Sequence, residues 1–119
     1  MDAKKLQEIA KEKFDAEESA RQHLVEVLKT MAYSPQAVTQ AMSKYIEAQG
    51  FAAPWRWVLE KADKLGLDVT QAAHVVMMDC QLRIHADERY KPGIAGARQA
   101  AERTGIYIFL DQMYRLMEG

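Results

Sequence analysis

The sequence has little cysteine, few turn-forming residues and no long apolar run. Its 119 residues include one cysteine, three prolines and six glycines. The lone Cys80 cannot form a disulfide within the chain, and the amino terminus is charged where a secretion signal needs an apolar core. No stretch reaches the roughly 18 uninterrupted apolar residues of a membrane span. We therefore expect a soluble protein of the reducing cytoplasm that does not associate with membranes.

The chain also lacks an excess of charge of one sign. Its 16 Lys and Arg residues and 17 Asp and Glu residues give a net charge of -1, and both signs are spread evenly along the sequence. A protein that holds nucleic acid by electrostatics needs a concentrated basic segment, which is missing here. Because 49% of the residues are hydrophobic, the chain can bury a core of its own. We predict a single helical domain over residues 1–119.

The apolar residues recur at helical spacing between the proline and glycine residues. This pattern predicts an all-α bundle of five or six helices, over residues 2–32 (as one helix or two), 34–50, 54–66, 70–90 and 97–117. Gly105 interrupts the last segment, and the apolar run 106–110 could also form a strand. No second strand signal exists to pair with it, so a helix is favoured, with its continuity over 104–117 left open.

The segment 70–90 contains neither Gly nor Pro, and its first two-thirds is apolar on nearly every side. A helix of this kind must be covered all round, so we predict that it lies at the centre of the molecule or between two copies. Steps of about 100° per residue separate a core stripe of Val, Ala and Cys residues from an opposite side. The residues of that opposite side are His74, Met78, Gln81 and His85. If other helices leave this side uncovered, a second subunit or another partner is expected to dock there.

No catalytic or metal-binding motif of useful specificity is present. His74 and His85 share a helix side but lie about 16 Å apart along the axis, too far to bind one ion. His23 precedes Glu26 in the reverse order of the Glu-x-x-His pairs of di-iron bundles. Cys80 falls on the predicted core stripe, where a thiol is normally inert. We expect no enzyme activity, no metal and no cofactor; a histidine in an interface could instead make a contact pH-sensitive.

Aromatic residues supply candidates for a contact surface. Trp55 and Trp57 flank Arg56, and residues two apart on a helix point in nearly opposite directions, so only one tryptophan can face the main core. Trp57 shares its side with Lys61, and an outward tryptophan beside cations is common in binding hot spots. The alternative interpretation is that Trp57 lies under the first helix or stacks with Lys61.

The last segment raises the same question at a larger scale. Tyr107 and Tyr114 lie on one side and Phe109 on another, so the segment is apolar over more than one contact requires. Either the segment is central too, in a monomer, or part of it is an interface between two copies.

We predict a small non-catalytic regulator, adaptor or inhibitor that binds another protein, with a homodimer favoured. The predicted partner-binding residues are Arg56, Trp57, His74, His85, Tyr107, Phe109 and Tyr114.

The alternative function is sequence-specific DNA binding. Residues 59–76, LEKADKLGLDVTQAAHVV, resemble the helix-turn-helix of bacterial repressors, with Ala62 where the helices meet and Gly66 in the turn. The residues of the implied recognition helix that would face DNA are Val69, Thr70, Ala73, His74 and Met77. Gln71 is the only side chain in its first two turns of a type that reads bases. The spacing therefore favours this alternative, whereas the charges do not.

Overall fold

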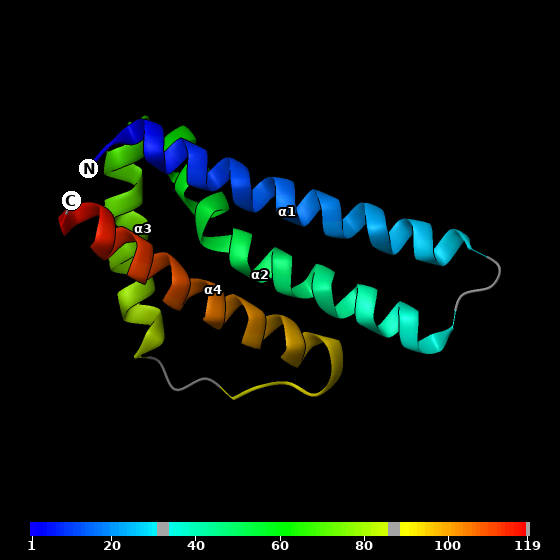
Figure 1. Cartoon of the computed structure of the whole chain (residues 1–119). Coiled ribbons are helices and arrows are strands. Elements are labelled where there is room, and N and C mark those ends of the chain that lie inside the picture. Colours follow the sequence, from blue (N-terminus) through cyan, green and yellow to red (C-terminus); the bar gives the residue numbers. More distant parts are fainter. Residues whose placement is uncertain (31–33, 86–88, 119) are drawn as a thin grey trace.

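The computed structural model describes residues 1–30, 34–85 and 89–118, and within these ranges all regular structure is helical. The helices are α1 (Ala3–Lys29), α2 (Pro35–Leu65), α3 (Val69–Ile84) and α4 (Gly93–Glu118) (Figure 1). The all-α prediction is confirmed. The prediction of five or six helices is wrong, because the segments 34–50 and 54–66 belong to one helix. The last segment forms a continuous helix without a strand.

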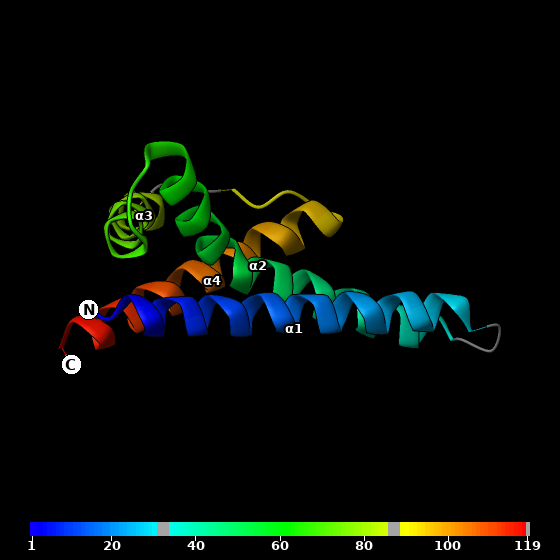
Figure 2. The ribbon, with the colours of Figure 1, turned by 90° about the horizontal axis from the view of Figure 1, so that it is seen from above.

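Gly50 and Pro54 lie inside α2 and end no helix. A proline within a helix removes one backbone hydrogen bond and bends the helix. Figures 1 and 2 show α2 changing direction in its green middle part. Gly50 is buried against α4, where a Cβ would overlap Ala101. The two residues that predicted helix ends thus mark a bend and a close helix contact.

Local hydrogen bonds define the ends of α2 and the start of α3. The Ser34 hydroxyl oxygen accepts a hydrogen bond from the Ala37 amide (3.1 Å), and Gly66 ends α2 in the left-handed conformation at φ 64°. Asp68 accepts from the Gln71 amide at 2.8 Å, while the Gln71 side chain accepts from the Asp68 amide at 3.2 Å. This reciprocal capping box starts α3 directly after a short turn.

The first half of α2 lies between α1 and α4, and the three helices form a layer (Figures 1 and 2). Within the described residues, the backbones of α1 and α4 do not come close, and only side chains at one end of the layer join these two helices in the core. The second half of α2 leaves this layer. The chain then turns, and α3 crosses the layer at the end where the N- and C-termini lie (Figure 1). The prediction that the helix near 70–90 is central within one chain is wrong: α3 buries one side only and ends at Ile84, and residues 86–88 lie outside the described ranges. The alternative, that two copies cover this helix, stays a prediction.

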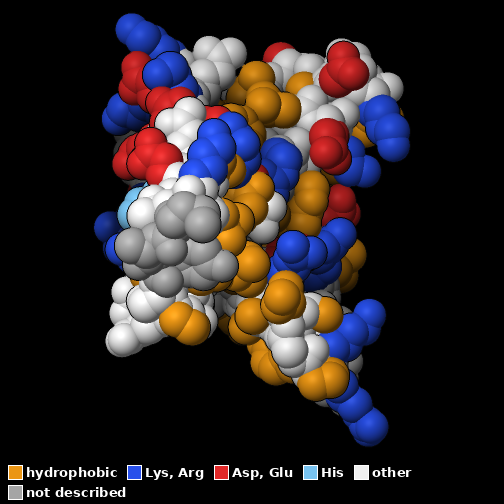
Figure 3. All heavy atoms as spheres, turned by 90° about the vertical axis from the view of Figure 1, so that its right-hand side faces the viewer, with side chains coloured by type: hydrophobic (Ala, Val, Ile, Leu, Met, Phe, Trp, Pro, Cys, Tyr) orange, Lys and Arg blue, Asp and Glu red, His pale blue; other side chains and the backbone are white. Residues whose placement is uncertain are grey.

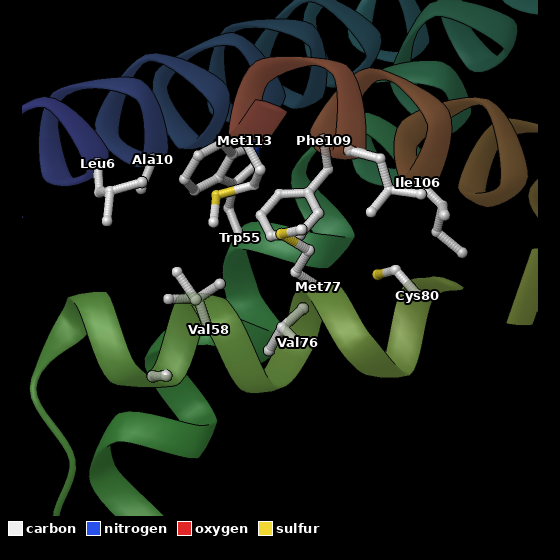
Figure 4. Packing of buried hydrophobic residues seen from close by; sticks show 13 residues of the cluster. Leu6, Ala10, Trp55, Val58, Val76, Met77, Cys80, Ile106, Phe109 and Met113 are labelled. Carbon is white, nitrogen blue, oxygen red and sulfur yellow. The ribbon is translucent and has the colours of Figure 1, made fainter. Parts of the chain in front are cut away.

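The main core lies where α3 crosses the layer. Trp55 of α2 and Phe109 of α4 meet there edge to face, with ring centroids 5.1 Å apart (Figure 4). Leu6 packs into the same cluster from α1, and Val76 and Cys80 pack into it from α3. The predicted core stripe of α3 is confirmed, because its buried residues are Ala72, Ala73, Val76, Met77 and Cys80.

The molecule is elongated. It measures 48 × 33 × 28 Å, and its radius of gyration is 16.0 Å, against about 13.5 Å for a compact domain of this length. At the end nearest the α1–α2 connection, hydrophobic side chains form a band between charged ones (Figure 3). Nowhere in the described residues does a helix combine the length and hydropathy needed to cross a membrane. In a single chain, several large apolar side chains therefore remain exposed to water.

Candidate interaction surfaces

Four large apolar side chains are exposed on the outer side of α3 and on α4. Met78 and Leu82 of α3 are 65% and 74% exposed, and Tyr107 and Tyr114 of α4 are 50% and 45% exposed. The Gln81 side-chain amide donates a hydrogen bond to the Tyr114 hydroxyl (2.6 Å) and so joins the two helices between these residues. We call the four apolar residues the α3–α4 surface.

The two histidines of the predicted docking side flank this surface. His74 and His85 are both exposed, as Met78 is, whereas Gln81 is partly buried by its contact with Tyr114. The predicted division of α3 into a core stripe and an opposite side is therefore confirmed. In the part of the chain that the structure describes, no group of three or more His, Cys, Asp or Glu side chains is arranged to bind a metal ion.

Two of the predicted partner-binding residues make contacts within the fold. Phe109 is completely buried beside Trp55, so its ring offers no surface to a partner. The Arg56 guanidinium donates to the carboxylate of Glu17 on α1 and to the carbonyl oxygen of Gln49 (3.0 Å). Sequence spacing could not reveal the Glu17 contact, because the two residues come from different helices.

Trp57 lies at a hollow between the second half of α2 and α3. Its ring is partly buried against the core, and the Cζ atom of Arg83 lies 4.3 Å from the ring centroid, a cation–π geometry. The hollow has a volume of about 320 Å³, and Lys61, Lys64 and Asp79 also line it. The alternative prediction, that Trp57 stacks with Lys61, is correct in the kind of interaction and wrong in the residue, because the cation over the ring is Arg83 of α3.

A second hollow lies between α3 and α4, and Arg83 lines it as well. Its volume is about 200 Å³, and Arg98, Glu102 and Arg103 contribute to its wall. Arg83 donates to Glu102 at 3.3 Å, and Arg103 donates to the carbonyl oxygen of Ile84 at 3.0 Å, which holds the end of α3 on α4. Sequence reasoning did not predict this cluster, because its residues belong to α3 and α4 and become neighbours only when the two helices pack together.

Cys80 is buried in the core, and burial raises the pKa of its thiol from 9.0 to about 11. The nearby positive charge of Arg83 opposes this shift but is the smaller effect. A thiol with a raised pKa stays protonated at neutral pH, and only the thiolate is a good nucleophile. The geometry therefore gives Cys80 a packing role.

The helix-turn-helix spacing is realised as two helices and a short turn, but the face that should read DNA is covered. Ala73 and Met77 would point toward a DNA groove in the resemblance, and both are buried in the core. Val69 and Thr70 are partly buried, which leaves His74 as the exposed member of that set. Base reading needs several polar side chains free to enter the major groove. This arrangement gives the DNA-binding alternative no further support.

Comparisons of the chain with protein-family models, with curated proteins and with solved structures find no match.

Proposed function

We propose that this protein is a non-catalytic cytoplasmic module that works by binding another protein, as regulators, adaptors and inhibitors do. The observation that carries the proposal is the α3–α4 surface, where four large apolar side chains are about half exposed or more. Contiguous apolar patches on a folded domain commonly mark interaction sites. Tyrosine and methionine are also enriched at protein interfaces.

The partner that we propose for this surface is a second copy of the chain. The accessible surface of the chain is 7847 Å², whereas a compact monomer of 13.5 kDa exposes about 6500 Å². The excess of about 1300 Å² is larger than the roughly 800 Å² that each partner buries in a standard interface. A homodimer would therefore bring the exposed surface toward the normal range.

The charges of the surface are compatible with self-association. In a two-fold symmetric contact the same patch occurs on both subunits, so a strongly charged patch would repel itself. The four residues that define the α3–α4 surface are uncharged, and the net charge of the chain is only -1. On α4, Asp111 and Arg115 lie close to Tyr114 in sequence and pair with each other at 3.0 Å.

Light scattering and sedimentation of the full chain across a concentration series test this proposal, because a dimer gains population with concentration. We expect a mass of two chains that shifts toward one chain on dilution. Replacing Met78 and Leu82 together by Glu should give a monomer at all concentrations. The matched control replaces Leu28 and Leu65 together by Glu, which also adds two charges at exposed residues but at the ends of α1 and α2, outside the α3–α4 surface.

Each outcome bears directly on the proposal. A monomeric mass for the unchanged chain at tens of micromolar would contradict it, because interfaces of standard size usually bind more tightly than that. A dimer that survives the Met78→Glu and Leu82→Glu changes would place the contact elsewhere. Circular dichroism of each variant checks that the helices remain, since these side chains are exposed and their replacement should cost little stability.

A further inference from the structure

Two hollows lie on either side of Arg83 and together span three helices, and we call the pair the groove. The first hollow lies between α2 and α3, and the second between α3 and α4. Arg83 lines both, and its guanidinium contacts the Trp57 ring (4.3 Å) and the Glu102 carboxylate (3.3 Å). An arginine with these two contacts, in the middle of a groove, offers a preorganised donor to a ligand that lies across it.

The groove is cationic in a chain that is slightly acidic overall. Its positively charged residues are Lys61, Lys64, Arg83, Arg98 and Arg103, and its negatively charged residues are Glu60, Asp79 and Glu102. Glu102 already pairs with Arg83. Because the net charge of the whole chain is -1, the remaining surface is acidic. The groove therefore attracts a negatively charged ligand more than the surface as a whole does.

The shape of the groove favours a polypeptide segment over a compact small molecule. The hollows have volumes of about 320 and 200 Å³, at or below the lower end of the roughly 300–1000 Å³ typical of small-molecule pockets. Two shallow hollows on either side of one arginine suit side chains that project at intervals from an extended backbone. Trp57 and Val76 also give the first hollow an apolar wall.

The acidic residues in the groove decide between two kinds of polyanion. A nucleic-acid backbone carries phosphates at regular short intervals and would bring some of them close to Glu60 and Asp79. A peptide can place its carboxylates opposite the cations and uncharged side chains opposite these two acids. We propose that the groove binds an extended acidic peptide segment of a partner protein. This site includes none of the four residues of the α3–α4 surface, although the Cζ atom of Arg103 in the second hollow lies 5.8 Å from the Tyr107 ring centroid, and it adds a second binding partner to the proposed homodimer.

In the proposed complex the bound segment contacts both ends of the groove and its apolar wall. Carboxylates of the bound segment pair with Lys61 and Lys64 at one end and with Arg98 at the other. An apolar side chain of the segment packs against Trp57 and Val76 in the first hollow. Arginine and carboxylate form charge-assisted hydrogen bonds, which are stronger than neutral ones. Binding should weaken as salt is added, because the groove is open to solvent.

Fluorescence anisotropy of a labelled peptide titrated with the full chain tests the proposal. The probe is a synthetic peptide of alternating Glu and Leu residues, and the matched control peptide has Gln in place of every Glu. We expect saturable binding of the acidic peptide at low salt and at least about tenfold weaker binding of the Gln peptide. The intrinsic tryptophan emission should change on binding, because Trp57 lines the first hollow.

Two variants with equal charge changes locate the site. Replacing Lys61 and Lys64 by Gln should weaken the acidic peptide at least about fivefold. Replacing Lys29 and Lys44 by Gln removes the same charge from exposed residues outside both hollows and should have less than about a twofold effect. The two double variants carry the same net charge, so nonspecific attraction cannot separate them.

Three results would overturn the proposal. They are equal binding of the acidic and Gln peptides, absence of saturable binding at low salt, and tighter binding of mixed duplex DNA than of the acidic peptide. A variant with Met78→Gln and Leu82→Gln, which adds no charge beside Arg83, separates this site from the homodimer. It should lose self-association and keep peptide binding, so each proposal can fail without the other.

Discussion

Gly50 of α2 and Gly105 of α4 lie directly against each other, with no room for a side chain on either. A Cβ atom on Gly105 would overlap the carbonyl group of Gly50 and lie 3.1 Å from the Cα atom of Phe51. A Cβ atom on Gly50 would lie within 2.6 Å of the Ala101 carbonyl oxygen. The backbones of α2 and α4 therefore approach closely at this point, and Trp55 and Phe109 come into contact about one turn further along each helix.

Gly105→Ala is expected to destabilise the protein despite the better helix propensity of alanine. The propensity gain is about 1 kcal/mol, whereas separating two packed helices typically costs about 1–3 kcal/mol or more. We expect a net loss of about 1–2 kcal/mol in the free energy of unfolding, measured by urea titration. The adjacent Thr104→Ala is the control, because Thr104 is exposed and its hydroxyl donates only within its own helix. A Gly105→Ala protein as stable as the control would contradict the close approach.

This helix contact also explains which parts of the fold could be predicted from the sequence. The apolar periodicity of α1, α3 and α4 identifies them as helices, and the capping residues near 34 and 66–68 mark true ends. Gly50 and Pro54 resemble helix ends because their local preferences disfavour a helix interior. Packing against α4 and the core overrides those preferences. The sequence alone does not show which α4 residues face Gly50, so the number of helices was overestimated.

Arg56→Gln is expected to lower stability because Arg56 connects α1 to α2. Its guanidinium donates to the partly buried Glu17 carboxylate and to the Gln49 carbonyl oxygen. Hydrogen bonds to charged groups contribute about 1.5–3 kcal/mol when well formed, and partial exposure of Arg56 reduces this. We expect a loss of about 1–2 kcal/mol in thermal or urea unfolding. Arg21→Gln is the control: Arg21 pairs only with Glu18 on the same exposed helix face, so its loss should cost less than about 0.5 kcal/mol.

The buried thiol of Cys80 is expected to make stability fall at alkaline pH. Burial raises its pKa to about 11 in the folded chain, against an ordinary value of 9.0. Above pH 9 the unfolded chain loses this proton while the folded chain keeps it, so the contribution is complete below pH 9 and disappears as the pH approaches 11. Cys80→Ala removes the titrating group but leaves a small cavity. The stability difference between the two proteins, measured by urea titration, should narrow as the pH rises through this range.

Thiol reactivity gives an independent measurement of the same burial. In the folded protein Cys80 should react with an aromatic disulfide reagent far more slowly than in urea, where the thiol is exposed. The rate at neutral pH should follow the opening of the core. Fast reaction of the native chain, comparable to that in urea, would show that the thiol is accessible and that its pKa is not raised by burial.

Only part of the candidate surfaces could be predicted from the sequence. The angular positions of His74, Met78 and His85 predicted one exposed side of α3, since helix geometry converts sequence spacing directly into direction. The groove could not be predicted in this way. Lys61, Arg83 and Arg98 belong to three helices, and their proximity depends on the bend of α2 and the crossing of α3 over α4. Periodicity carries information about one helix at a time.

Phe109 and Tyr114 allow the core to be distinguished from the α3–α4 surface with a pair of substitutions on one helix. Phe109 is fully buried, so Phe109→Ala should cost about 3–5 kcal/mol in the free energy of unfolding. Tyr114 is about half exposed and is not part of the core cluster. Tyr114→Ala should therefore lower the free energy of unfolding by about 1 kcal/mol or less, including the loss of its hydrogen bond with Gln81. Urea unfolding measures both values, at a fixed protein concentration because dimerisation contributes to apparent stability.

Sedimentation of the folded Tyr114→Ala chain should show weaker self-association than the unchanged protein. If Tyr114→Ala destabilises the fold as much as Phe109→Ala does, Tyr114 is a core residue, and the α3–α4 surface loses one of its four members.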